Sequence, residues 1–390
     1  MDLDAFRWLL TDDGYRLLRD ATEAGDDSLR THALLRRSAE PAQVAAALTQ
    51  VELRRRAATK FGDLAARMFF TSEGLEQATR LPVATHRAAR LSASGSTTLV
   101  DLGCGIGGDL IAFARAGLTC VGLDLDPLRV AVAEANLAAL ELGGVVAQAD
   151  ATTIALDPFD VVYADPARRT ARGRSFDADK WTPPWSFVET LLDRDAVVKL
   201  APGIPHDLVP EGVEAEWVSD HREVKEAVLW SGRLATTRRR ATVLSTAPDG
   251  TSGLATLTVE DDPGAPVGPV ADFLYEPDGA VIRAGLVTAV AAGVGGHLVD
   301  EHIAYVTAAG AFRTPFARGY RVIEELPFRE KPLRAALRER GIGRLTIKKR
   351  GVSVVPEELR RRLALSGESE ATVVLTRVAG KGTALLVEPL

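Results

Sequence analysis

Residues 100–109, "VDLGCGIGGD", form the most informative segment of this chain. A buried-type apolar strand runs into it, glycines follow at positions 103, 105, 107 and 108, and a helical pattern begins directly afterwards. Glycine permits positive φ and lets a ligand approach the backbone closely. A strand that runs through such a turn into a helix is typical of parallel α/β sheets that bind ligands at the carboxyl ends of their strands.

The sequence after this stretch alternates between strand and helix patterns. We expect helices over 109–117 and 127–142, and strands over 98–103, 119–126, 144–150, 159–166 and 195–202. Two further apolar runs, 227–232 and 241–246, are expected to pair as the last two strands. This alternation predicts a Rossmann-like, doubly wound parallel sheet.

Helical periodicity dominates the residues before the sheet, and a Pro- and Gly-rich run, "DDPGAPVGPV" (261–270), follows it. Short strands and helices alternate in the remainder of the chain. We therefore expect three domains: a helical N-terminal domain (1–91), a Rossmann-like domain (92–262) and a small α+β domain (270–390).

Composition narrows the class of protein. The 390 residues are 46% hydrophobic and 26% charged, as in globular proteins. No long uncharged apolar stretch predicts a membrane-spanning helix, and the first twenty residues do not resemble a signal peptide. Two cysteines are too few for a disulfide framework or a metal site. We expect a cytoplasmic protein without a metal; the sequence does not indicate its oligomeric state.

Two ligands compete for the glycine turn. Gly103, Gly105 and Gly108 fit the dinucleotide pattern G-x-G-x-x-G, with Asp124 as the ribose-binding acid. Asp101 favours another ligand, because a carboxylate before the first glycine gives a pyrophosphate nothing and suits an ammonium and a sulfonium. The pattern Asp-x-Gly-x-Gly-x-Gly is similar to the first motif of class I S-adenosylmethionine-dependent methyltransferases.

This resemblance implies S-adenosylmethionine as the cofactor. The first motif would comprise Asp101, Gly103, Gly105 and Gly107. Asp124 ends the second strand, where the family's acid holds the ribose hydroxyls, and Asp150 ends the third, near the adenine amino group. Each aspartate alone could instead cap a helix or a loop. Their succession at consecutive strand ends favours the cofactor.

The fourth strand ends in "DVVYADPARR" (160–169). Asp165 and Pro166 resemble the Asp/Asn-Pro-Pro-aromatic motif of amino-group methyltransferases. That resemblance implies a carboxylate that accepts hydrogen bonds from an amino group and orients it toward the methyl, with a proline that stiffens the turn. In place of the aromatic ring stands Arg168, which could stack on a base, clamp a phosphate or pair with nearby acids.

A related class, the 5-methyluridine enzymes, also carries Asp-Pro-x-Arg but needs a nucleophilic cysteine downstream of it. No cysteine follows Cys120, so covalent C5 chemistry is disfavoured.

Residues 97–170 are similar to the trimethylguanosine synthase group. The flanking runs "KFGDLAARMFF" (60–70), "VVKLAPG" (197–203) and "IKKRG" (347–351) resemble a narrower set of bacterial methyltransferases with a C-terminal THUMP-like domain. THUMP domains belong to RNA-modifying enzymes, so the resemblance implies structured RNA as the partner.

Charge is unevenly distributed along the chain. The net charge is −6, yet residues 329–362 hold twelve Lys or Arg against four Asp or Glu, a balance of +8. Such a segment can track phosphates, or it can be a solvated face. The residues expected to contact nucleic acid are Lys348, Lys349, Arg350 and Arg361.

The sequence therefore predicts an S-adenosylmethionine-dependent methyltransferase acting on a base nitrogen of structured RNA. One alternative is a methyltransferase for a small molecule or a protein, with the basic segment idle. Another is a non-catalytic RNA-binding protein that retains the cofactor pocket, which the altered Asp-Pro-Ala-Arg motif would support. An NAD-dependent oxidoreductase is a further alternative, which titration with each cofactor would distinguish.

Overall fold

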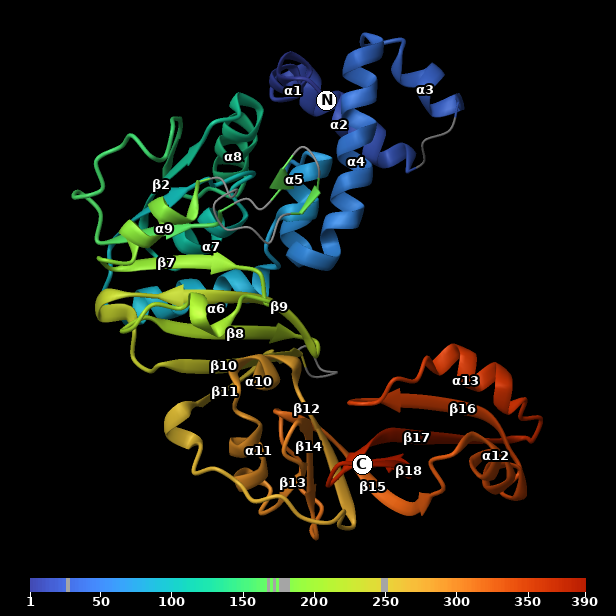
Figure 1. The fold of residues 1–390 in the computed structure, drawn as a ribbon. Coiled ribbons are helices and arrows are strands. Elements are labelled where there is room, and N and C mark those ends of the chain that lie inside the picture. The colour runs from blue at the N-terminus through green and yellow to red at the C-terminus, as the bar shows by residue number, and fades with distance from the viewer. Residues whose placement is uncertain (26–28, 167–168, 171–172, 175–182, 247–251) are drawn as a thin grey trace. The chain divides into compact units, whose positions relative to one another are not determined.

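A computed structural model describes residues 1–390 except 26–28, 167–168, 171–172, 175–182 and 247–251 (Figure 1). The chain divides into two compact units. The first contains residues 1–200, 210–213 and 228–236, and the second contains residues 201–209, 214–227 and 237–390. These bounds differ from the three expected domains, which remain a prediction. Among the described residues, the structure contains no helix with the length and apolarity needed to cross a membrane.

The first unit begins with the expected helices, coloured blue in Figure 1. Threonine side chains cap two of them: Thr11 accepts a hydrogen bond from the N–H of Gly14, and Thr71 from that of Gly74. A proline at the first helical position begins the longest helix. The helices are α1 (Leu3–Leu9), α2 (Asp12–Ala24), α3 (Leu29–Leu35), α4 (Pro41–Phe61), the 3-10 helix η1 (Gly62–Ala66), α5 (Ser72–Gln77) and α6 (Leu81–Ala93).

Between η1 and α5 the chain passes, outside any helix or strand, through the fully buried residues Met68, Phe69 and Phe70. Buried backbone groups need hydrogen-bond partners, and here two buried side-chain amides supply them. Asn136 accepts from the Phe69 N–H (2.6 Å) and donates to the Phe69 carbonyl (3.0 Å). Gln50 does the same for Phe70, at 2.9 and 2.7 Å. The helical segment is thereby joined to the α/β segment within one core.

The sheet of the first unit is parallel, as predicted, with the strand order β7-β4-β1-β2-β3. Alternate residues of β1 and β4 belong to two different cores: Leu99 and Tyr163 lie in the larger one, and Val100 and Val162 in the smaller. The strands are β1 (Thr98–Leu102), β2 (Thr119–Asp124), β3 (Val145–Gln148), β4 (Val161–Ala164) and β7 (Ala196–Leu200), with helices α7 (Gly108–Arg115), α8 (Pro127–Ala139) and α9 (Trp185–Leu191) and a short hairpin, β5 (Arg169–Thr170) and β6 (Gly173–Arg174).

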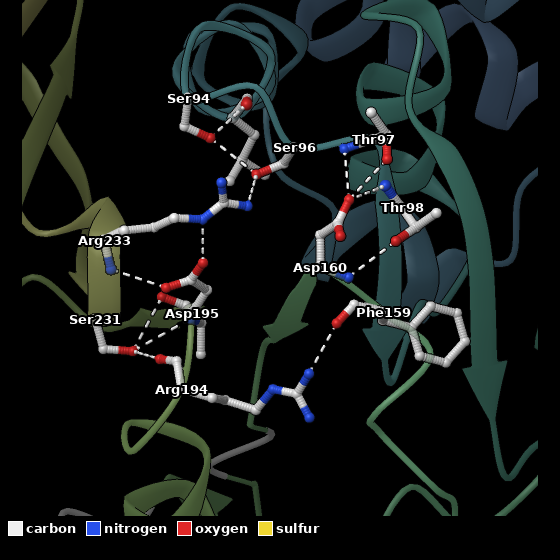
Figure 2. Close-up of polar contacts among 12 residues, drawn as sticks. Ser94, Ser96, Thr97, Thr98, Phe159, Asp160, Arg194, Asp195, Ser231 and Arg233 are labelled. Atoms are coloured by element: carbon white, nitrogen blue, oxygen red, sulfur yellow. Dashed lines mark hydrogen bonds and ion pairs between the residues drawn. The ribbon is translucent and has the colours of Figure 1, made fainter.

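A network of side chains fixes the amino-terminal edge of these strands (Figure 2). The Asp160 carboxylate accepts hydrogen bonds from the N–H of Thr97 (2.8 Å), its hydroxyl (2.7 Å) and the N–H of Thr98 (3.0 Å). Asp195 accepts from the N–H of Arg233 at 2.8 Å and forms an ion pair with its guanidinium. These contacts set the strand register at the edge opposite the glycine turn.

The second unit corrects one expectation. The segment 227–232, whose first four residues end β9 (Glu223–Trp230), does not pair with 241–246, part of β10 (Arg239–Thr246), because the two neighbours of β10 are β8 (Glu214–Asp220) and β11 (Ser252–Thr258). β10 is parallel to β8 and antiparallel to β11. The strand β8 was not expected because three of its seven residues are acidic, although all seven are buried. The division between the units passes through β9.

The remainder of the second unit is a small α+β arrangement, as expected, with more strands than the sequence indicated. Its seven-stranded sheet has the order β13-β14-β12-β15-β18-β17-β16, in which β16 and β17 are parallel. The strands are β12 (Phe273–Pro277), β13 (His297–Asp300), β14 (Ile303–Ala308), β15 (Ala317–Leu326), β16 (Ile342–Lys349), β17 (Ser369–Val378) and β18 (Lys381–Pro389).

The helices of the second unit are short. Gly285, with φ of 68°, ends the first of them. The α-helices are α10 (Gly279–Ala284), α11 (Val287–Gly293), α12 (Glu330–Glu339) and α13 (Pro356–Leu363), and single 3-10 turns are η3 (His206–Leu208) and η5 (Val259–Asp261), with η4 (Gly232–Leu234) in the first unit.

Candidate active site

The glycine turn leaves β1 and enters α7 with three positive φ angles, +98° at Gly103, +58° at Gly105 and +81° at Gly107. A Cβ added to Gly103 or Gly105 would meet no atom within 4 Å, whereas one on Gly107 would lie 3.3 Å from the Cβ of Ala133 in α8. The first two glycines therefore keep open space beside the backbone, which a ligand can enter. The third permits close packing of the turn against α8.

Asp101 is a buried carboxylate with no partner. Its residue is 1% exposed, and neither carboxylate oxygen accepts a hydrogen bond from any residue that the structure describes. Burial raises the pKa of Asp101 well above its ordinary value, and the charges of Asp109 and Asp165 raise it further against the opposing effect of Arg87 and Lys199. An unsatisfied buried carboxylate is costly, so this group fits a cofactor that brings an ammonium.

A second carboxylate close to Asp101 is fully partnered. Asp109, in α7, forms an ion pair with the buried guanidinium of Arg87 in α6 and accepts a hydrogen bond from the Thr79 hydroxyl at 2.8 Å. Burial alone would raise the pKa of Asp109, but the charges of Arg87 and Lys199 hold it below its ordinary value. The Arg87 guanidinium also lies 5.0 Å from the centroid of the Tyr163 ring.

Asp124 joins the glycine turn to the end of β2. One carboxylate oxygen accepts from the N–H of Gly105 at 3.0 Å, and the other from the N–H of Asp126 at 2.9 Å. The residue is only 8% exposed. Each oxygen keeps a second lone pair, so the group can fix the turn and still accept from a ligand hydroxyl.

Asp150 lies beyond the end of β3 and is exposed. One of its oxygens accepts from the N–H of Thr152 (2.9 Å) and from the Thr152 hydroxyl (2.8 Å), and these bonds lower its pKa. The side chain therefore fixes a local turn. Its carboxylate belongs to this turn and does not take part in the charge cluster around Asp101.

Asp165 and Pro166 directly follow β4, at the carboxyl ends of the parallel strands, where the glycine turn also lies. Asp165 forms an ion pair with Lys199 of β7, and Pro166 is buried. Arg168 lies outside the described residues. The structure thus forms a charge cluster from the carboxyl ends of β1, β4 and β7 and from the helices α6 and α7. Its members are Asp101, Asp109, Asp165, Arg87 and Lys199.

The four basic residues expected to contact nucleic acid separate into two pairs. Lys348 forms an ion pair with Glu276 at 2.6 Å, and the Arg350 guanidinium lies 5.3 Å from the centroid of the Tyr305 ring. Both are half-buried. Lys349 and Arg361 are exposed, the latter on α13. Of the four, only Lys349 and Arg361 are exposed.

Sequence reasoning missed Arg87, Asp109 and Lys199. Lys199 could have been found as the one charged residue of the strand "AVVKL" (196–200) at its carboxyl end. Asp109 follows the glycines directly, but its position suits a helix start equally well. Nothing in the pattern around Arg87 distinguishes it from Arg90, the other arginine of α6.

The fold and the turn define a Rossmann-like protein of the methyltransferase class, and comparison with known proteins agrees. Residues 99–170 match the family model of a methyltransferase domain, residues 317–389 match a THUMP domain-like model, and residues 2–57 match a domain of unknown function. A crystal structure of a protein described as a methyltransferase from Porphyromonas gingivalis W83 has the same fold, with a TM-score of 0.76 and 23% identity over 95% of this chain and 96% of that one.

The sequence comparison gives the family. Proteins named as uncharacterised S-adenosylmethionine-dependent methyltransferases in two strains of Mycobacterium tuberculosis are 39% identical over 342 residues, covering 84% of this chain and 90% of theirs. The chain belongs to this family of S-adenosylmethionine-dependent methyltransferases with a C-terminal THUMP-like domain. Its cofactor is S-adenosylmethionine.

Proposed function

We propose that this methyltransferase acts on a base nitrogen of structured RNA in the cytoplasm. The observation that carries the proposal is the position of Asp165, directly after β4, next to the strand that carries the unpartnered carboxylate of Asp101. A carboxylate at this edge can accept a hydrogen bond from an amino group and hold its nitrogen beside the cofactor.

The residues of the first unit fit the cofactor, which supplies a methyl group activated on a sulfonium. Asp101 would pair with its ammonium, because that carboxylate has no other partner among the described residues. Gly103 and Gly105 leave room for its approach, and Gly107 lets α8 support the turn. Asp124 would accept from the ribose hydroxyls. Asp150 is proposed for the adenine amino group through the turn it fixes.

Asp165 and Pro166 would hold the acceptor. In the transfer that they would support, an N–C bond would form while the S–C bond broke, with S-adenosylhomocysteine as the leaving group and the proton of the acceptor nitrogen passing to solvent. Because the methyl is already activated, the protein mainly has to position the nitrogen. Arg168 is proposed as a substrate clamp on the strength of its sequence position alone.

The choice of RNA is supported by the THUMP domain-like match over 317–389 and by the basic segment 329–362. Lys349 and Arg361 are exposed and can reach phosphates. Lys348 and Arg350 would contribute less, because Glu276 and Tyr305 already engage them. The alternative acceptors are a small molecule or a protein, for which the basic segment would be idle.

The test is transfer of labelled methyl from S-adenosylmethionine to RNA prepared from cells that lack the protein, so that the target site is empty. We expect label in RNA with the native protein and at least a hundredfold less with Asp165→Ala, in line with losses on misplacing a reacting group by about 1 Å. The matched control is Asp160→Asn, a carboxylate at the opposite end of the same strand, which should retain activity. Equal activity of the native protein and Asp165→Ala would refute the proposal.

A further inference from the structure

Lys199 is out of place among its neighbours. It belongs to β7, whose other four residues are buried and apolar. In the register of β4 and β7, Tyr163 lies opposite Val197 and Ala164 opposite Val198, so Asp165 comes next opposite Lys199. The chain therefore places a lysine in a central strand at the position facing the residue of the Asp-Pro motif.

The contact between the two side chains is partly enclosed and uses one carboxylate oxygen of Asp165. Lys199 Nζ forms an ion pair with Oδ2 of Asp165, with side-chain exposures of 14% and 36%. No described residue donates a hydrogen bond to Oδ1 of Asp165. A charge-assisted hydrogen bond in such partly enclosed surroundings orients a carboxylate more firmly than a surface ion pair does.

The charges around this contact explain why a lysine is needed there. The cluster contains three carboxylates, Asp101, Asp109 and Asp165, and two cations, Arg87 and Lys199. Arg87 is committed to Asp109 by an ion pair within the first unit. Lys199 is therefore the cation that balances Asp165, while the carboxylate of Asp101 is left for the cofactor.

We propose that Lys199 is a positioning residue for methyl transfer, which holds Oδ2 of Asp165 and leaves Oδ1 to accept a hydrogen bond from an uncharged N–H of the acceptor. This inference rests on the proposed function of Asp165 as the acceptor-binding carboxylate. It gives a role to Lys199, for which the resemblance of the run 197–203 implied none, and it narrows the chemical class of the methyl acceptor.

The class follows from charge. Because Lys199 already balances Asp165, a cationic acceptor such as a protonated amine would meet an ammonium within a few ångströms, and like charges at that range repel. An exocyclic amino group of a base is neutral and only donates hydrogen bonds to the carboxylate. The pair therefore favours a nucleobase amine over the amine of a lysine side chain.

The kinetic test compares Lys199→Met and Lys199→Arg with the native protein in the RNA transfer assay. We expect Lys199→Met to lower kcat by about 10–100-fold, the range for a misplaced reacting group, while KM for RNA and Kd for S-adenosylmethionine change by less than about threefold. Lys199→Arg should recover most of the rate, since a guanidinium can hold the same carboxylate.

The matched control is Arg240→Met, which removes a similarly enclosed ion pair, 17% exposed and 2.8 Å from Glu214, outside the cluster. It should reduce thermal stability and leave kcat unchanged. If Lys199→Met behaves like Arg240→Met, with stability lost and kcat retained, Lys199 is only structural and the proposal is wrong.

A crystal structure of Lys199→Met tests the positioning without any acceptor. The proposal predicts that the Asp165 carboxylate leaves its position while the backbone of β4 stays in place. An unmoved carboxylate would overturn it. If the native protein fails to methylate RNA, the proposed function fails, and this structural result still decides whether Lys199 positions Asp165.

Discussion

At the scale of single residues, the site is organised around the carboxylate of Asp101. It is fully buried, it has no partner among the described residues, and other carboxylates lie close to it. A buried carboxylate without a partner is costly in its charged form, so it is either protonated or paired with a ligand of opposite charge. The ammonium of S-adenosylmethionine is the compensation that we propose.

This arrangement predicts that cofactor binding releases a proton. The pKa of Asp101 is raised in the free protein, mainly by burial, and an ammonium placed beside the carboxylate would lower it. Between the two pKa values the free protein holds a proton that the complex does not, so affinity should increase with pH in that window. Calorimetric titrations in buffers of different ionisation enthalpy should reveal the release. Asp101→Asn should abolish it, and buffer-independent heats for the native protein would contradict the account.

Part of the site could be predicted from sequence, because its residues lie in one local pattern. Asp101 and the glycines follow each other within seven positions, and Asp165 and Pro166 are adjacent. Arg87 and Lys199 could not be predicted in the same way. They meet the aspartates only through the packing of α6 on α7 and the pairing of β7 with β4, and neither contact leaves a local pattern.

At the scale of elements, the N-terminal helices support the glycine turn. Asn136 in α8 donates a hydrogen bond to the Ile106 carbonyl within the turn (2.8 Å) and holds the backbone of Phe69 from the helical segment. Gly74 of α5 lies so close to the turn that a Cβ there would come within 2.3 Å of an Ile106 methyl. The helical segment and the glycine turn are therefore packed directly against each other.

Asn136→Ala should lower the stability of the protein, because it removes the side chain that joins the helical segment to the glycine turn. The substitution leaves the Phe69 N–H and two carbonyls buried without partners, and each unsatisfied group costs about 1–3 kcal/mol. We expect the free energy of unfolding to fall by about 2–4 kcal/mol, measured by urea denaturation. The same change at Gln50 should have a similar effect. A loss below about 0.5 kcal/mol, the size of an ordinary surface substitution, would show that water replaces the amide.

The network in Figure 2 predicts a pH dependence at the opposite edge of the sheet. Hydrogen bonds from Thr97, and then Thr98, hold the pKa of Asp160 below its ordinary value. A depressed folded-state pKa means that the stabilisation is complete above the unfolded value of about 4 and is lost as the pH falls below it. Asp160→Ala should therefore lower Tm at pH 7, and the difference from the native protein should shrink toward pH 3. A constant difference would contradict this explanation.

The strand β8 could not be predicted from the sequence, for a physical reason. β8 buries three acidic residues, which the sheet tolerates because Arg240 pairs with Glu214 and Thr242 donates to Glu216. These partners come from β10, twenty-six residues later along the chain. The local sequence of β8 does not show these partners and is typical of an exposed polar loop. The pattern therefore favours direct pairing of the two apolar runs 227–232 and 241–246.

At the scale of the whole molecule, the chain combines a methyltransferase domain, matched over 99–170 in the first unit, with a THUMP-like domain, matched over 317–389 in the second. The parallel sheet was predictable, because its strands and helices alternate at regular spacing. The seven-stranded sheet was harder to predict from the sequence, because its strands mix polar and apolar residues. Several of them pair with strands far along the chain, as β12 does with β15 and β15 with β18.

Substitution of the basic residues of the second unit should affect either RNA affinity or thermal stability, depending on whether the side chain is exposed or paired. The double variant Lys349→Ala/Arg361→Ala should weaken binding of a fluorescently labelled tRNA and lower the salt dependence of log K by about one for each phosphate that is no longer neutralised. Its Tm should be unchanged, because both side chains are exposed. Lys348→Ala should instead lower Tm, since it leaves Glu276 without its ion pair. Fluorescence anisotropy across a salt series checks the first statement, and equal salt slopes for all variants would contradict it.

The most direct test of the account is the identity of the methylated atom. RNA from cells lacking the protein would be incubated with S-adenosylmethionine carrying a trideuterated methyl group, digested to nucleosides and analysed by mass spectrometry, with Asp165→Ala in parallel. We expect a trideuterated methyl on a base nitrogen of one nucleoside, absent with Asp165→Ala. A label on a ribose or a base carbon, or none in RNA at all, would contradict it.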